Sequence, residues 1–166
     1  MIKYLLLLLP FFAQAKEIAF YGFGLSYHGY GMNSKEIAGK VPHKLDSMGK
    51  ATYHPEISIL YSDEYLYGVT YLKNTFNNDA FMFSFGKSHQ VAKYTQTGIM
   101  ASLYINEREP GVAEPNIVQN SKYNLMFFPW VFLKQDIKIT SKINFSMFLT
   151  SNFFLSHLAF GTSVQL

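Results

Sequence analysis

Large apolar residues and small or polar residues alternate along most of the chain, in runs of roughly ten residues separated by turn-forming residues. The run from Tyr53 to Tyr61 is the clearest, with Tyr, Pro and Ile at odd positions and His, Glu, Ser and Leu at even positions. Side chains of a β-strand point alternately to its two faces, so this period of two predicts strands. Eight runs are predicted as strands: residues 21–28, 53–61, 65–72, 80–86, 98–103, 122–133, 136–145 and 157–166.

The two faces of these runs differ in a way that favours a membrane barrel. In the first run one face carries Tyr21, Phe23, Leu25 and Tyr27, and the other carries Gly22, Gly24, Ser26 and His28. The bulky face suits lipid, and the small or polar face suits the narrow lumen of an eight-stranded barrel, which must close because lipid cannot pair with backbone N–H groups. The sequence therefore predicts an all-β, eight-stranded antiparallel transmembrane β-barrel. A soluble lipocalin-like barrel or a β-sandwich explains the same alternation and stays an alternative.

The first fifteen residues, "MIKYLLLLLPFFAQA", have the pattern of an export signal. Lys3 provides a positive start, an apolar stretch follows, and Ala13-Gln14-Ala15 fits a cleavage site with small residues. The apolar stretch is shorter than a membrane-spanning helix requires. We therefore predict a cleaved signal peptide at residues 1–15 and a single barrel domain at residues 16–166.

Composition agrees with export to a membrane. The chain has 16 Phe and 12 Tyr but only 15% charged residues, which is a very aromatic exterior for a small soluble domain. It has no cysteine, so it has no disulfide framework, and its net charge of +3 is too small to indicate nucleic-acid binding. No later segment is a continuous apolar run of roughly 20 residues, which argues against membrane-spanning helices.

The lengths of the connections predict the orientation of the barrel. With the N-terminus in the periplasm, "SDE" at residues 62–64 and "KQD" at residues 134–136 read as tight periplasmic turns. The long links at residues 32–49 and 106–121 then lie on the outer side, as is usual for outer-membrane barrels. The link "KSHQVAKYT", residues 87–95, is long for a periplasmic turn.

This topology brings residues with useful chemistry to the outer rim. His28 ends the first strand on the lumen face, and Asn74 and Thr75 follow the third strand at the same end. His54 and, more deeply, Glu56 approach the same mouth from the second strand. An imidazole, a hydroxyl and an amide in one place are suited to acyl transfer. Each also has a structural interpretation, either as a hydrogen-bonded lumen side chain or, for Asn74 and Thr75, as a turn residue.

The remaining histidines and the glycine-rich stretch predict no cofactor. His43 is expected in a loop, while His89 and His157 fall outside the rim group on this topology. The chain lacks cysteine and the spacing of histidine ligands, so we expect no metal site. The stretch "GFGLSYHGYG" does not lead from a strand into a helix and is not a nucleotide-binding fingerprint.

Two motifs resemble the lipid A palmitoyltransferases, eight-stranded outer-membrane barrels that move an acyl chain from a phospholipid to lipid A. In that family an essential histidine ends the first strand among aromatic residues, and "LSYHGYG" around His28 is similar. The family's third strand ends in Lys-Asp-Ser-Trp-Asn, and "LKNTFNN" resembles that run. Asn74 stands at the position of the acid and Thr75 at that of the serine. The family's amphipathic helix before the first strand has no counterpart here.

A proline in a late strand extends the resemblance. Pro129 in "LMFFPWVFLKQD" matches a proline that, in the family, opens the hydrogen-bonded wall so that lipid enters sideways. The resemblance implies an outer-membrane, monomeric acyltransferase whose partners are phospholipid and lipopolysaccharide. It assigns His28 as general base, with Asn74 and Thr75 binding the acyl carbonyl. The alternatives are a non-catalytic barrel with a structural or binding role, and a lipid A deacylase. An eight-stranded barrel is too narrow for a porin.

Overall fold

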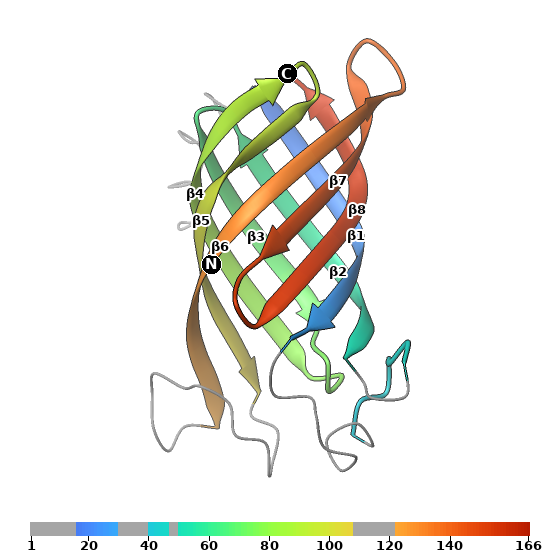
Figure 1. Ribbon diagram of the computed structural model, residues 1–166, viewed down its shortest axis with the longest axis vertical. Helices are drawn as coiled ribbons and strands as arrows, with labels where there is room; N and C mark the ends of the chain where they lie inside the picture. Colours follow the sequence, from blue (N-terminus) through green and yellow to red (C-terminus); the bar gives the residue numbers. More distant parts are fainter. Residues whose placement is uncertain (1–15, 30–39, 47–49, 108–121) are drawn as a thin grey trace, which may run out of the picture.

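The computed structural model describes residues 16–29, 40–46, 50–107 and 122–166 and shows a closed, all-β barrel of eight antiparallel strands (Figure 1). Each strand pairs with the next in sequence, and the last pairs with the first. The predicted signal peptide and most of the two long links lie outside the described residues. The strands are β1 (Glu17–His28), β2 (Ala51–Ser62), β3 (Tyr65–Lys73), β4 (Asp79–Ala92), β5 (Thr95–Glu107), β6 (Tyr123–Lys138), β7 (Ile143–Ser151) and β8 (Leu155–Gln165).

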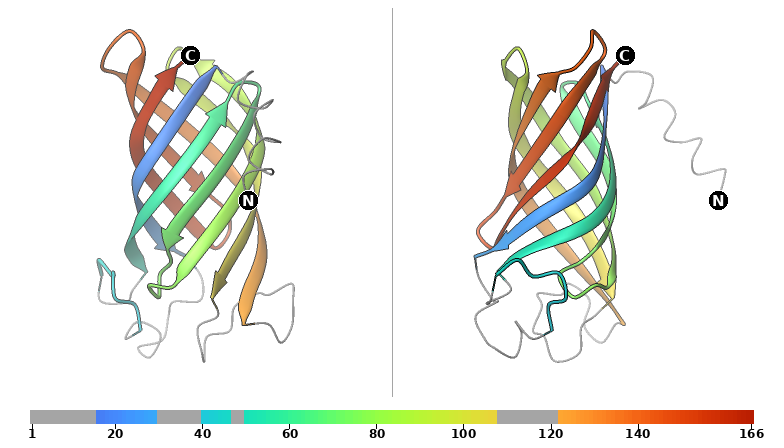
Figure 2. Two further views of the ribbon diagram at one scale, coloured as in Figure 1. Left: turned by 180° about the vertical axis from the view of Figure 1, so that it is seen from behind. Right: turned by 90° about the vertical axis from the view of Figure 1, so that its right-hand side faces the viewer.

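The two ends of the barrel differ in their connections, as Figures 1 and 2 show. At one end, which we call the turn end, β1 begins, β8 finishes, and short turns at residues 63–64, 93–94 and 139–142 join neighbouring strands. At the other end, the loop end, β1 and β5 lead into the long links, and turns at residues 74–78 and 152–154 close the remaining hairpins. This arrangement agrees with the predicted asymmetry of short and long connections.

The two faces of the wall carry different residues, as the alternation predicts. Side chains facing the lumen are mainly small or polar, and many are fully buried: Thr52, Leu66, Ser102, Asn106, Asn124, Ser146 and Ser163 among them. Large apolar side chains cover the exterior instead, including Phe20, Phe23, Ile57, Val69, Phe81, Phe83, Phe85, Ile99, Phe127 and Val131. An apolar exterior of this kind is stable in lipid and costly in water.

The predicted faces of β1 are wrong at one point. A β-bulge between Tyr21 and Phe23 shifts the register of β1 against both β2 and β8. An extra residue in a bulge reverses the alternation, so Tyr21 faces the lumen and Gly22 faces outward. The Tyr21 hydroxyl then finds a partner in Ser146, at 2.9 Å, which satisfies a polar group that lipid could not.

Two predicted connections are also wrong. The "KQD" triplet does not form a turn, because β6 continues through it and turns only after Lys138. Lys134 and Asp136 instead face the lumen, where they pair with each other. The "KSHQVAKYT" link is mostly strand, since β4 reaches Ala92 and β5 begins at Thr95. Charged and polar residues therefore continue the inward-facing rows rather than marking turns.

The wall is uneven at the loop end. Pairing between β6 and β7 begins only at Val131 and Ser151, so residues 123–130 of β6, which include Pro129, have no β7 partner among the described residues. We call these residues the open edge of β6. Figure 1 shows β5 and β6 continuing past the end of the β7–β8 hairpin. The hairpin tip carries two exposed phenylalanines, Phe153 (93% exposed) and Phe154.

Candidate functional site at the loop end

His28 and Thr75 meet at the loop end, as the sequence predicts. The Thr75 hydroxyl lies 2.9 Å from Nε2 of His28, although the two residues are 47 positions apart in the chain. His28 ends β1, and Thr75 lies in the β3–β4 turn, so the turn carries the hydroxyl across the mouth of the barrel. The pair could exchange a proton, but its contact alone assigns no activity.

Asn74 holds the turn that presents Thr75. Its side-chain oxygen accepts hydrogen bonds from the backbone N–H groups of Phe76 and Asn78, at 3.0 and 2.9 Å. Asn77 completes the turn with a φ of 65°, a conformation that asparagine tolerates better than most residues. Asn74 is therefore a positioning residue for Thr75, and its amide oxygen is already occupied.

His54 is a structural lumen residue. Its Nδ1 lies 2.8 Å from the carbonyl oxygen of Lys73, which can only accept, so Nδ1 carries the proton. Its Nε2 then accepts from the Thr52 hydroxyl at 3.0 Å. Both ring nitrogens are satisfied, and the residue is buried. His43, predicted in a loop, links the 40–46 segment to Tyr53 and Asn77, each at 3.0 Å.

A second group of residues forms a hydrogen-bonded chain across three strands. The Ser26 hydroxyl on β1 lies 2.8 Å from Nδ1 of His157 on β8. Nε2 of His157 lies 2.8 Å from Oε2 of Glu56 on β2. The Glu56 side chain is also held by the Ser58 hydroxyl, which donates to Oε1 at 3.2 Å. The prediction that His157 lies outside the rim group is therefore wrong.

Gly24 makes this chain possible. It lies between β2 and β8 and pairs with His54 on one side and Ala159 on the other. A Cβ atom at position 24 would come within 2.2 Å of Cε1 of His157 and 2.4 Å of Oε2 of Glu56. Glu56 and His157 thus meet directly over Gly24, through space that any larger residue would fill.

The lumen next to this chain is nearly full. A cavity of about 20 Å³ is lined by Glu56, His157, Tyr21 and neighbouring small or apolar residues. A single water needs at least about 10–15 Å³ on the same measure, so this space fits one or two waters. An acyl chain does not fit in this part of the lumen.

The turn end of the lumen is closed by charge. Lys134 is only 1% exposed and forms ion pairs with Glu17 and with Asp136, the latter at 2.5 Å. The Ser163 hydroxyl donates to Asp136 at 3.3 Å, and Asn144 donates to Ser163 at 3.2 Å. Two carboxylates and one ammonium in a buried cluster need these partners, because an unpaired charge there would be very costly.

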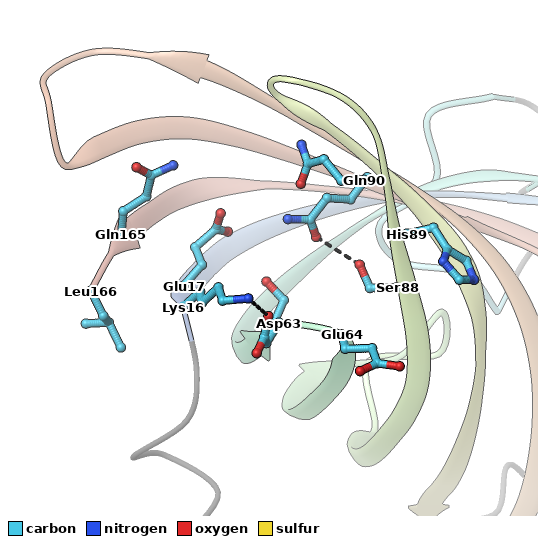
Figure 3. A pocket seen from close by; sticks show the side chains of 11 residues that line it. Lys16, Glu17, Asp63, Glu64, Ser88, His89, Gln90, Gln165 and Leu166 are labelled. Atoms are coloured by element: carbon cyan, nitrogen blue, oxygen red, sulfur yellow. Dashed lines mark hydrogen bonds and ion pairs between the residues drawn. The ribbon is translucent and has the colours of Figure 1, made fainter.

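Beyond this cluster the turn end opens into a hollow of about 570 Å³, shown in Figure 3. Its lining is mainly polar and of mixed charge, and at its rim Lys16 pairs with Asp63 at 2.7 Å. The hydrogen bond to Asp63 raises the pKa of the Lys16 ammonium above its ordinary value. Most charged side chains around the hollow form ion pairs, Lys16 with Asp63 and Lys87 with Glu64. This end of the barrel therefore resembles a polar opening filled with solvent.

The described residues show neither a metal-binding cluster nor a membrane-spanning helix. In residues 16–29, 40–46, 50–107 and 122–166, no group of three or more histidine or acidic side chains is placed to hold a metal ion. The same part of the chain contains no helix long and apolar enough to cross a bilayer.

Comparisons with known proteins support the fold and nothing finer. No model of a known protein family matches the chain, and no curated protein matches it in sequence. Among solved structures it is similar to a chain from work described as "De novo design of transmembrane beta-barrels". The identity is 10% and the TM-score 0.51, over 92% of this chain and 98% of the designed one. The chain has the fold of a transmembrane β-barrel. This fold, with its apolar exterior, indicates a location in a membrane.

Proposed function

We propose that this protein is a small, non-conducting barrel of the outer membrane, with a structural or binding role at its loop end. The observation that carries this proposal is the filled lumen. Inward-facing side chains are hydrogen-bonded to one another along the barrel, and the interior cavity near its middle measures about 20 Å³. The Lys134 cluster adds a second closure at the turn end. Together these features leave no continuous path for water or ions through the described part of the barrel.

The test is conductance. The purified barrel, inserted into a planar bilayer at 1 M KCl, should produce no steps above the baseline of the bilayer. Removal of residues 30–39 and 108–121 should leave the bilayer silent too, because the side chains that fill the lumen come from the strands. Regular conductance steps in either protein would overturn the proposal.

The outer membrane and the partners follow from the expected topology. The export signal predicted from the sequence, with short turns at one end and long links at the other, supports an outer-membrane location. Phospholipid and lipopolysaccharide would then surround the barrel, which has a closed wall along most of its length and needs no second copy to satisfy its strands. Fractionation of cells should place the protein with outer-membrane markers, and any other location would contradict this part of the proposal.

A second candidate function is acyl transfer from a phospholipid to lipid A, favoured by the contact between His28 and Thr75. His28 would act as general base, and Thr75 would donate to the acyl carbonyl. The open edge of β6, with Pro129 in it, supports entry of lipid from the side. Because the lumen is full, the acyl chain would have to remain in the bilayer during transfer.

Mass spectrometry of lipid A separates the two candidates. Cells producing the protein should show one additional acyl chain under the second candidate, and His28→Ala should reduce that product by roughly 10²–10⁴-fold. His89→Ala is a matched control, since His89 is exposed at the turn end of the barrel, far from the pair. An unchanged lipid A profile would remove the second candidate and leave the structural role.

A further inference from the structure

The Ser26–His157–Glu56 chain is used by neither proposed function. Its two hydrogen bonds connect a hydroxyl, an imidazole and a carboxylate in the order that activates a serine nucleophile. The residues come from three strands, and their meeting depends on the closure of the barrel, which pairs β1 with β8, and on the absence of a side chain at Gly24.

The proton positions in this chain follow from its acceptors. A glutamate carboxylate can only accept, so Nε2 of a neutral His157 carries the proton and donates it to Glu56. Nδ1 is then the basic nitrogen, and it accepts from the Ser26 hydroxyl. The two ring nitrogens have exchanged roles relative to the common serine triad, but the direction of proton transfer is unchanged.

The hydrogen-bonded chain of Ser26, His157 and Glu56 lies on the side of the barrel where the β7–β8 hairpin ends before β5 and β6 do. On β8 His157 follows Ser156, whose partner Ser151 is the last residue of β7. Beyond this pair lie Leu155, the first residue of β8, and the hairpin tip at residues 152–154, and the open edge of β6 begins at the same level. His157 is the most accessible of the three side chains, at 15% exposed, whereas Glu56 is buried. Leu155, the next inward residue of β8 toward the hairpin tip, packs with Phe128 against the core, so a group that reaches the imidazole passes beside these two apolar side chains.

A buried donor stands near this level without a partner. The indole N–H of Trp130, an inward-facing residue of the open edge of β6, has no hydrogen-bond partner among the described residues. The next inward residue of β6, Phe132, pairs with Thr150, and Thr150 pairs with His157. A buried donor without an acceptor is unusual and would be satisfied by a carbonyl oxygen entering from the open edge.

We propose that Ser26 is a nucleophile that accepts the acyl group of a membrane lipid ester, with His157 as its base and Glu56 as the residue that positions His157. Oγ of Ser26 attacks the ester carbonyl carbon as its proton passes to Nδ1 of His157. The bond to the lipid alkoxide then breaks, and His157 returns the proton to that oxygen, which leaves as an alcohol. Water, or the hydroxyl of a second lipid, then attacks the carbonyl carbon of the Ser26 ester and gives its proton to Nδ1 of His157. The bond to Oγ of Ser26 breaks, His157 returns the proton to Oγ, and the acyl group leaves as a fatty acid or as a new ester.

The residues that surround Ser26, His157 and Glu56 indicate the class of substrate. Phe127, Val131 and the two phenylalanines of the hairpin tip are exposed around the open edge of β6, so this side faces lipid. The adjoining cavity of about 20 Å³ cannot hold an acyl chain, but it borders Glu56 and His157. An ester whose chain stays in the bilayer and whose carbonyl alone reaches inward fits both facts.

The test uses an alkyl fluorophosphonate, which reacts with activated serines and marks the residue it modifies. The full chain, folded in phosphatidylcholine vesicles, should be labelled at Ser26, as located by peptide mass spectrometry. Ser26→Ala should abolish the labelling, and His157→Gln should slow it by roughly 10²–10⁴-fold. Ser102→Ala is the matched control, because Ser102 is an equally buried lumen serine that pairs with Ser84 and should leave labelling unchanged. No labelling of the parent protein, or labelling that survives Ser26→Ala, would overturn the proposal.

Glu56→Gln tests positioning separately from folding. Fluorescence of Trp130, the one tryptophan of the sequence, reports whether each variant is folded. In the folded variant the labelling rate should fall, and the pH at which it reaches half its maximum should move; a lumen residue with a structural role alone would move neither. Labelling should persist in His28→Ala, so loss of lipid A acylation there and loss of labelling in Ser26→Ala are distinguishable. Equal labelling in Glu56→Gln and the parent would contradict the role of Glu56.

Discussion

The two ends of the lumen contain buried polar clusters of different kinds. At the turn end, Lys134 lies between Glu17 and Asp136, and formal charges neutralise one another in a closed part of the barrel. At the loop end, the groups are hydroxyls and imidazoles with a single carboxylate, Glu56, beside an incomplete wall.

This difference indicates how a narrow barrel can separate stability from chemistry. A charged cluster loses much of its stabilising effect if any member is removed, so it suits a part of the lumen that need not change. A chain of hydroxyl and imidazole groups beside one carboxylate can pass a proton, because hydrogen bonds and not a fixed cation hold that carboxylate. The loop end is therefore the better place for a reacting group, and the turn end is the better place for a closure.

The largest effect is expected from Lys134→Met, which keeps the length of the side chain and removes its charge. Glu17 and Asp136 would remain buried without their cation, and the free energy of unfolding should fall by about 3–5 kcal/mol. Urea titration in detergent micelles, followed by Trp130 fluorescence, measures this change. Replacing all three residues together, as Glu17→Gln, Lys134→Met and Asp136→Asn, should recover most of the loss. An undiminished stability in Lys134→Met would show that the turn-end cluster does not stabilise the barrel.

A more selective change is Gly24→Ala at the loop end. The new methyl group would displace the ends of the His157 and Glu56 side chains, both of which can move. We expect a loss of about 1–3 kcal/mol in stability and a fall of at least about 10²-fold in fluorophosphonate labelling of Ser26.

Gly68→Ala is the matched control for that prediction. Its Cβ would come within 2.1 Å of Cδ2 of Leu60, again the end of a flexible side chain, but away from Ser26. Gly68→Ala should cost similar stability and leave labelling unchanged. A similar fall in labelling in both variants would mean that the loop-end site responds to any disturbance of the lumen, and the contrast between the two ends would be lost.

The sequence predicts the barrel well because lipid outside and a packed lumen inside require each strand to alternate large apolar residues with small or polar ones. Every inward residue predicted for β2, from His54 to Leu60, faces the lumen, since a strand between lipid and a packed lumen tolerates no slip in register. The errors in the prediction arise where this alternation is interrupted. A bulge at Gly22 leaves no clear signal in the alternation, and the charged "KQD" triplet resembles a turn until Lys134 is known to pair with Glu17 and Asp136 in the lumen.

The candidate site was predictable only in part. His28 and Thr75 follow from the direction of the strands, because both lie where a strand ends at the same rim. The Ser26–His157 contact requires the exact register between the first and last strands, which depends on the bulge. The closure of the barrel was the available signal, since it pairs the two ends of the chain. The filled lumen could not be predicted, because it depends on how side chains from all eight strands pack.

The smallest effect is expected from Pro129→Ala on the open edge of β6. Proline lacks the N–H that a paired strand needs, but at this position β6 has no β7 partner among the described residues. Alanine would restore a donor that has no acceptor to meet, so stability should change by no more than about 0.5 kcal/mol. Ala101→Pro, in the paired strand β5 directly opposite, should instead lower stability by about 3 kcal/mol or more, because it removes a donor from the wall. If both changes proved equally costly, the wall would be as complete beside Pro129 as it is elsewhere. The loop end would then be closed in the same way as the turn end, and lipid could not reach His157 from the side.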